Sequence, residues 1–235
     1  MPEVPISAIL FDKDGTLFDF RSSWGAFAAD LLARLARDAA HRADLGRAMG
    51  YDPVTGQFAC DSIMIAATTD EIAAAMLPHL PGIDANDLVD LLNTLSVSAL
   101  MHPAVPLRPV LDGLRARGLR LGVATNDTEA PARSHLDAAG IRDLFDFVAG
   151  CDSGHGAKPE PGMLLAFARS QGLQPARVAM VGDSRHDLIA ARRAGMWAVA
   201  VLTGVAGRAE LAPHADVVLA DIGALGAWLD GLATA

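Results

Sequence analysis

Short apolar runs that each end at a turn recur along this chain, and they constrain its fold more than any other feature. Five of them have the length and composition of buried strands: 6–11, 120–125, 177–181, 197–202 and 215–219. Helical patterns lie between the later runs, each followed directly by a glycine, at 105–117, 128–139, 160–171 and 185–194. Strands that alternate with helices form parallel sheets covered on both faces, so the sequence predicts a doubly wound α/β fold.

Residues 18–102 interrupt this alternation. The stretch contains no convincing strand, and apolar side chains from Trp24 to Leu31 recur on one face of a helix. Thr68 begins a capping-box pattern, and Asp84 can cap a further helix. We therefore expect an all-helical domain at 18–102, inserted into a discontinuous core domain made of 1–17 and 103–235.

Composition excludes several classes of partner. The formal net charge is -9 and the isoelectric point about 5.1, which argues against binding nucleic acid or a membrane surface through bulk charge. The two cysteines make no disulfide framework, and the start of the chain lacks the pattern of a signal peptide. The apolar stretch 195–207 is too short to span a bilayer. We expect a soluble cytoplasmic protein, as a monomer or a homodimer.

Polar side chains follow four of the apolar runs, at the point where each predicted strand ends. In chain order they are Asp12 and Asp14, then Thr125 and Asn126, then Lys158 beyond a run at 147–149, then Asp183 and Asp187. In open parallel sheets, ligands bind outside the carboxyl ends of the strands. We therefore expect these side chains to meet in one site.

The acids in this set indicate a metal and a nucleophile. Asp12, Asp14 and Asp183 would repel one another at one sheet edge unless a cation were present, and Mg²⁺ prefers a few carboxylates together with waters and a substrate phosphate. A carboxylate can attack phosphorus to form an acyl phosphate, and we assign that attack to Asp12. Asp14 is then placed to protonate the leaving alcohol and later to activate water. Asp187, one helical turn after Asp183, is expected to hold Asp183 or a metal-bound water.

The remaining candidates are predicted to bind phosphate. Thr125, with Asn126 and the amides that follow, can hold phosphate oxygens near a helix N-terminus. Lys158 would neutralise the phosphate and Asp12 together, and Arg21, just past the first polar turn, is a candidate substrate contact. Each also has an ordinary structural interpretation, such as a helix cap for Thr125 or a solvated surface lysine for Lys158. Their placement at several strand ends favours the functional one.

Four segments resemble, in order, the motifs of the haloacid dehalogenase-like (HAD) hydrolase superfamily: FDKDGTL, VATND, AKPEPGM and VGDSRHD. Within that superfamily, the segments are most similar to phosphoglycolate phosphatase and its relatives. It implies an aspartyl nucleophile at Asp12, acid–base catalysis by Asp14, and Mg²⁺ on Asp12, Asp183 and the main-chain carbonyl of Asp14. It also implies a helical cap inserted after the first motif.

The resemblance indicates the class of reaction but does not identify the substrate. The dehalogenase branch has a tyrosine-like residue in place of the second acid, so Asp14 favours phosphoryl chemistry. Asp127 stands where the phosphoglycolate phosphatases tend to have lysine or a small residue, which leaves the exact ester open. We expect a Mg²⁺-dependent phosphomonoester hydrolase for a small phosphorylated metabolite, such as phosphoglycolate or a sugar phosphate. The alternatives are a phosphomutase of the same fold and a non-catalytic binding protein that retains the fold.

Overall fold

A six-stranded sheet forms the centre of the larger part of the molecule. The computed structural model describes residues 6–233. The strands are β1 (Ala8–Phe11), β4 (Arg120–Ala124), β5 (Phe147–Ala149), β6 (Val178–Gly182), β7 (Trp197–Val201) and β8 (Val217–Leu219). They lie in the order β5-β4-β1-β6-β7-β8, and every neighbouring pair is parallel. The doubly wound parallel sheet that the apolar runs predict is thus confirmed.

Helices cover both faces of this sheet. They are α5 (Leu107–Ala116), α6 (Glu129–Ala138), α7 (Gly162–Ser170), α8 (Arg185–Ala194), α9 (Arg208–Leu211) and α10 (Leu225–Ala233). Short 3-10 helices complete the described chain: η1 (Ile63–Ile65), η2 (Leu77–His79), η3 (Arg142–Leu144), η4 (Pro175–Arg177), η5 (Ala212–His214) and η6 (Ile222–Ala224). The expected helices at 105–117, 128–139, 160–171 and 185–194 correspond to α5 to α8, with ends that differ by two residues or fewer.

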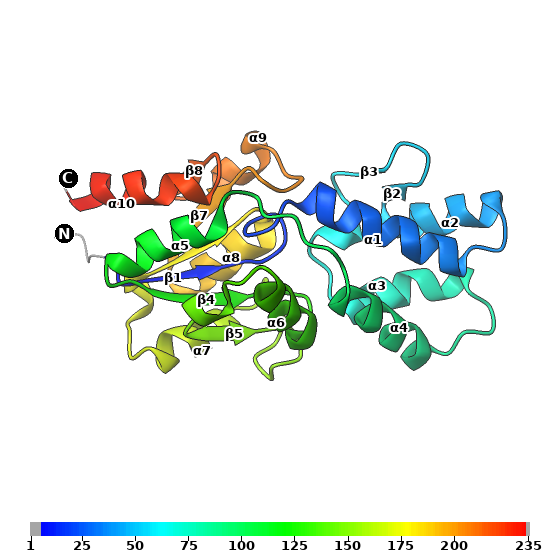
Figure 1. The fold of residues 1–235 in the computed structure, drawn as a ribbon, viewed down its shortest axis with the longest axis horizontal. Coiled ribbons are helices and arrows are strands. Elements are labelled where there is room, and N and C mark those ends of the chain that lie inside the picture. Colours follow the sequence, from blue (N-terminus) through cyan, green and yellow to red (C-terminus); the bar gives the residue numbers. More distant parts are fainter. Residues whose placement is uncertain (1–5, 234–235) are drawn as a thin grey trace.

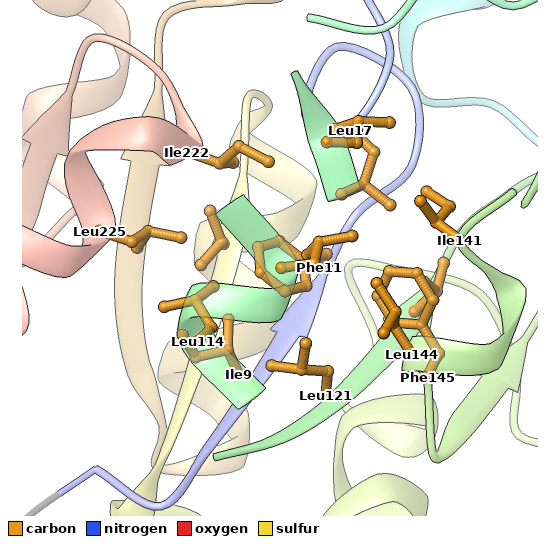
Figure 2. Packing of buried hydrophobic residues seen from close by; sticks show 14 of the residues in the cluster. Ile9, Phe11, Leu17, Leu114, Leu121, Ile141, Leu144, Phe145, Ile222 and Leu225 are labelled. Carbon is orange, nitrogen blue, oxygen red and sulfur yellow. The ribbon is translucent and has the colours of Figure 1, made fainter. Parts of the chain in front are cut away.

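Strand β1 shows why an uninterrupted apolar run suits the middle of such a sheet. All four of its residues are fully buried, and alternate side chains enter different cores. Ile9 and Phe11 pack into the cluster that Figure 2 shows, which also contains Leu114 of α5 and Leu225 of α10. On the other face, Leu10 joins a cluster with residues of α7 and α8. Burial on both faces fixes this strand at the centre and places its carboxyl end beside those of β4 and β6.

The insert forms a group of helices at one end of the molecule, away from the chain termini (Figure 1). Its elements are α1 (Phe20–Leu35), α2 (Ala39–Met49), β2 (Tyr51–Asp52), β3 (Gln57–Phe58), α3 (Thr69–Met76) and α4 (Ala85–Val97). The predicted capping box at Thr68 and the cap at Asp84 are both present. The insert has its own buried cluster, which includes Trp24, Leu31 and Leu92. The domain limits of 18–102 stay a prediction.

One feature of the insert differs from the expected all-helical structure. Strands β2 and β3 pair as a short antiparallel hairpin, Tyr51 with Phe58 and Asp52 with Gln57. Two-residue strands carry too little period-two pattern to stand out in a sequence. Here the Asp52 carboxylate accepts hydrogen bonds from Val54 N and Thr55 Oγ1 and so closes the turn. None of the helices within residues 6–233 combines the length and the apolar character needed to cross a bilayer.

Candidate active site

A pocket lies where the insert meets the carboxyl ends of the central strands. It encloses about 60 Å³, room for several water-sized groups. From the sheet domain it is lined by Asp12, Asp14, Thr125, Asn126, Asp127, Lys158, Ser184, His186 and Asp187. The remaining lining residues come from the insert. The polar residues that follow separate strands in the sequence therefore do meet at one place.

Three buried carboxylates form the centre of this region. Oxygens of Asp12, Asp183 and Asp187 all lie within 4.8 Å of one another. Asp12 directly follows β1, where its amide donates to Val181 O of β6 at 2.8 Å, and Asp183 directly follows β6. Glycines leave space for the Asp183 carboxylate, because a Cβ at Gly15 or Gly204 would collide with it. Gly15 also has a φ of 82°, which favours glycine.

The negative charges of the carboxylates in this cluster repel one another unless a cation binds among them. Burial raises the pKa of Asp12 to about 7 against the lowering effect of Lys158, with the charges of Asp187 and Asp14 adding to the rise. Burial likewise raises the pKa of Asp183 well above its usual range, with contributions from Asp12 and Asp187. Among the described residues, Asp183 Oδ2 is a buried oxygen without a hydrogen-bond partner. This unsatisfied oxygen and the all-oxygen donor set fit a divalent metal ion.

Lys158 supplies the positive charge next to this cluster. Its Nζ lies 2.5 Å from Asp12 Oδ1 and 2.7 Å from Asp187 Oδ1. Burial by itself would lower the pKa of Lys158, but Asp12 and Asp187 outweigh it and raise the pKa above its ordinary value. Lys158 is therefore a fixed ammonium ion beside Asp12.

Asn126 positions the Lys158 backbone. Its Nδ2 donates to Lys158 O at 2.8 Å and to Ala66 O of the insert at 2.7 Å, and its Oδ1 accepts from Lys158 N at 2.8 Å. The amide thus links the sheet, the lysine and the insert. Because both donor protons of Asn126 are engaged, its predicted contact with phosphate has no support from this geometry and stays a prediction.

Thr125 and Asp187 each make a structural hydrogen bond and also line the pocket. Thr125 is buried at the end of β4, where its Oγ1 accepts from Asp127 N at 3.1 Å. Asp187 closes a capping box at the start of α8 by accepting from Ser184 N and Ser184 Oγ, while its other oxygen faces Lys158. The helix cap therefore orients Asp187 in the acidic cluster, so the structural and functional interpretations of this residue are compatible.

A second buried ionic cluster surrounds Lys13, and nothing in the sequence pattern indicated it. Both Asp14 oxygens lie 2.7 Å from Lys13 Nζ, and Asp127 Oδ2 lies at 3.3 Å. His135 Nδ1 of α6 lies 3.1 Å from the same nitrogen, and the ammonium group is 5.4 Å from the centre of the Trp24 ring. Asp14 is thus held at the edge of the pocket by its neighbour in the chain. The DxD spacing gives no sign of this role for Lys13.

The same cluster connects the sheet domain to helix α4 of the insert. An ammonium group only donates, so His135 Nδ1 accepts from Lys13, and Nε2 carries the proton that is donated to Ser96 O at 2.7 Å. Ser96 Oγ donates to Asp127 Oδ2 at 3.3 Å. Burial and the charge of Lys13 together lower the pKa of His135 to about 4, against the opposing effects of Asp14 and of the hydrogen bond to Ser96.

This neutral histidine predicts a pH dependence of stability. The folded pKa of about 4 lies below the unfolded value of 6.5, so the contribution of His135 is complete above pH 6.5 and is lost as the pH falls towards 4. The loss is on the order of 3 kcal/mol. We expect the free energy of unfolding of His135→Gln, measured in urea from pH 4.5 to 7.5, to decline less towards acid than that of the wild type. Parallel pH profiles for the two proteins would contradict this assignment.

Arg21 does not join the site. Its side chain is exposed and donates from Nη1 to Gln57 Oε1 in the hairpin at 3.1 Å, and it is not among the residues that line the pocket. The side chains that face the pocket from the insert are largely apolar and include Trp24, which also belongs to the buried cluster of the insert. The first helix begins at its N-cap Asp19, and this start turns Trp24 rather than Arg21 towards the site. Substrate contact by Arg21 therefore has no support from the structure.

Fold and site together define an α/β protein with a buried acidic cluster suited to a divalent cation. Comparison with known proteins identifies the family of the chain. A family model described as haloacid dehalogenase-like hydrolase matches residues 6–195. The chain is 38% identical over 120 residues to a phosphoglycolate phosphatase of Rhodospirillum rubrum, an alignment that spans 51% of this chain and only 50% of that relative. It is 32% identical over 198 residues to a protein of Dickeya dadantii named probable phosphatase IndB, with 84% and 81% of the two chains covered.

A solved structure shows the same fold. The crystal structure of a predicted phosphoglycolate phosphatase from Haemophilus somnus superposes with a TM-score of 0.73 over 95% of this chain and 97% of that one, at 20% sequence identity. Identity at this level supports the fold alone. The family match, in contrast, covers most of the chain including all four motifs. The chain belongs to the haloacid dehalogenase-like hydrolase family, which confirms the resemblance found in its motifs.

Proposed function

We propose that this chain is a Mg²⁺-dependent phosphatase that hydrolyses a small phosphate ester through an aspartyl phosphate on Asp12. The observation that carries the proposal is the position of Asp12, which directly follows the central strand, contacts Lys158, and belongs to the buried cluster with Asp183 and Asp187. The names of the R. rubrum and D. dadantii relatives support phosphoester hydrolysis as the reaction. We further propose that residues 18–102 act as a cap that excludes bulk water from the pocket.

The reaction divides into two balanced displacements. In the first, an oxygen of Asp12 forms a bond to phosphorus while the ester P–O bond breaks, and Asp14 gives its proton to the departing alcohol oxygen. In the second, the Asp14 carboxylate takes a proton from water as the water oxygen attacks the same phosphorus. The bond between phosphorus and Asp12 then breaks, which releases inorganic phosphate and restores the carboxylate.

Other residues provide charge at the site. Lys158 is placed to bind a phosphoryl oxygen while it stays paired with Asp12, and Thr125 is placed to bind another. Asp12, Asp183 and Asp187, together with the main-chain carbonyl of Asp14, are the groups that would hold Mg²⁺. When bound there, Mg²⁺ offsets the charge repulsion between an anionic ester and an anionic nucleophile.

The proposal is tested by phosphate release from p-nitrophenyl phosphate. We expect release in the presence of Mg²⁺, loss of release in excess EDTA, and recovery when Mg²⁺ is added back. Acid quenching during turnover is expected to trap a phosphoenzyme that hydroxylamine cleaves, as it does an acyl phosphate. Absence of release, release that EDTA does not affect, or a long-lived phosphoenzyme without phosphate release would each contradict a Mg²⁺-dependent phosphatase.

A further inference from the structure

The side of the pocket that the insert forms is largely apolar. Ten lining residues come from the insert, and none of these ten carries a charge: Trp24, Phe27, Met64, Ile65, Ala66, Ala67, Thr69, Ile72, Leu92 and Ser96. Thr69 and Ser96 are the two with hydroxyl groups, and both are hydrogen-bonded, Thr69 to Asn93 and Ser96 to Asp127. Trp24 adds one uncharged donor, because its buried Nε1 has no hydrogen-bond partner among the described residues. With the phosphoryl group at Asp12, the rest of a small ester has to lie against this apolar wall.

The two lysines of the chain are not free to bind a second anion there. Lys158 already bridges Asp12 and Asp187, and in the proposed reaction it also faces the phosphoryl group. Lys13 is fully buried against Asp14 and does not line the pocket. Neither ammonium group is therefore available to contact the leaving group of the substrate.

Three other basic side chains are no better placed. Arg21 donates to Gln57 and does not line the pocket. Arg185 is exposed and lines a neighbouring cavity instead. His186 lines the pocket, but it is exposed at the start of α8, where water screens its interaction with an anion.

Carboxyl groups outnumber ammonium groups among the residues that line the pocket, where Lys158 is the one lysine. Four carboxylates line it: Asp12, Asp14, Asp127 and Asp187. A carboxylate on the leaving group would lose its hydration against apolar side chains, would find no buried cation in return, and would approach Asp14 and Asp127. An uncharged apolar leaving group avoids all three costs and gains from burial of its own surface.

We infer that the site selects phosphate esters whose leaving group is uncharged and apolar, and that it discriminates against carboxylate-bearing esters such as phosphoglycolate. This inference rests on the proposed phosphatase activity and adds the substrate class. The phosphoglycolate phosphatase name of the R. rubrum relative therefore does not extend to the preferred substrate of this chain. Asp127 agrees with the same conclusion, because it is a further carboxyl group in the pocket lining.

The test compares two esters of nearly the same shape on the full-length protein with Mg²⁺. Phosphoglycolate and isobutyl phosphate differ in that an isopropyl group replaces the carboxylate. We expect kcat/KM for isobutyl phosphate to exceed that for phosphoglycolate by about tenfold or more. The carboxylate makes glycolate the better leaving group, so intrinsic reactivity works against the expected preference. A smaller preference, or a preference for phosphoglycolate, overturns the inference.

A charge introduced into the apolar wall provides the matched test. Ile72 of α3 is half-buried, so a lysine there can reach solvent and still face the pocket. Ile72→Lys is expected to reduce the ratio of kcat/KM for isobutyl phosphate over phosphoglycolate at least fivefold or so, whereas the uncharged Ile72→Met keeps a ratio close to that of the wild type. Ile65→Lys, also half-buried, serves if Ile72→Lys does not fold.

The outcomes separate this inference from the proposed function. No phosphate release from either ester or from p-nitrophenyl phosphate would remove the phosphatase proposal itself. Mg²⁺-dependent release with phosphoglycolate preferred would leave the phosphatase in place and overturn only the substrate class. A ratio that does not change in a folded lysine variant would show that the leaving group does not lie against the insert, which also overturns the inference.

Discussion

Asp12→Asn is expected to lower kcat with p-nitrophenyl phosphate by at least about 10⁴-fold, because an amide oxygen is too weak a nucleophile to form the acyl phosphate. No phosphoenzyme should be trapped by acid quenching during turnover. The substitution is nearly isosteric, so the pocket should keep its shape. Steady-state phosphate release and the quench experiment measure the two effects on the same preparation.

Loss of folding would not explain this result. Burial raises the pKa of Asp12 to about 7, so the ionised carboxylate is unfavourable in the folded protein above that pH, whereas asparagine stays neutral. In EDTA at pH 8, the variant should therefore unfold at a urea concentration no lower than the wild type. Asp143→Asn is the matched control, because Asp143 is exposed and pairs with Arg108 on the surface. Full activity in Asp12→Asn, or an equal loss in Asp143→Asn, would remove Asp12 from the nucleophile position.

Lys158→Met is expected to lower kcat/KM by about 10³-fold, the second largest effect. Methionine replaces the aliphatic stem but leaves Asp12 and Asp187 without the ammonium group that lies within 2.7 Å of both. The phosphate then approaches a site of higher negative charge. Lys158→Arg, which keeps the charge in a larger side chain, should retain more activity than Lys158→Met.

Metal binding distinguishes the role of Lys158 from that of the acids. Removing a cation next to carboxylates makes the cluster more negative, so Mg²⁺ should bind Lys158→Met at least as tightly as it binds the wild type. Asp183→Asn is the contrasting variant, because it removes one of the proposed ligand charges and should weaken Mg²⁺ binding. Isothermal titration with Mg²⁺ alone measures both. Weaker binding to Lys158→Met would indicate that the lysine orders the metal ligands rather than the phosphate.

The central sheet was predictable because its signals are local. A run such as that of β1 has apolar side chains at every position, and only a strand covered on both faces buries them all. The glycines that follow the helical patterns mark helix ends in the same direct way, as Gly195 does after α8 with a φ of 72°. Parallel topology then brings the ends of β1, β4 and β6 together, so the meeting of their polar residues also followed from the sequence.

The insert was less predictable because its details depend on contacts between segments. The hairpin of β2 and β3 contains two residues in each strand, too few to show alternation. Arg21 lies beside the first motif in the sequence, but the register of α1 directs Trp24 to the pocket and leaves Arg21 at the surface. Proximity in sequence is thus a poor guide to contact where a helix begins, since residues three positions apart lie about 4.5 Å apart along the helix axis and can contact different neighbours.

The sequence by itself determined that Asp12 and the other polar residues after the strands meet. Strand pattern and parallel topology place such residues at one edge of the sheet. Only the tertiary structure decided the environment of those residues. Lys13 meets His135, 122 positions further on, and the apolar wall over the site is assembled from separate turns of the insert. Burial and charge at a site depend on all the segments that pack around it, and no local pattern encodes which of these segments meet.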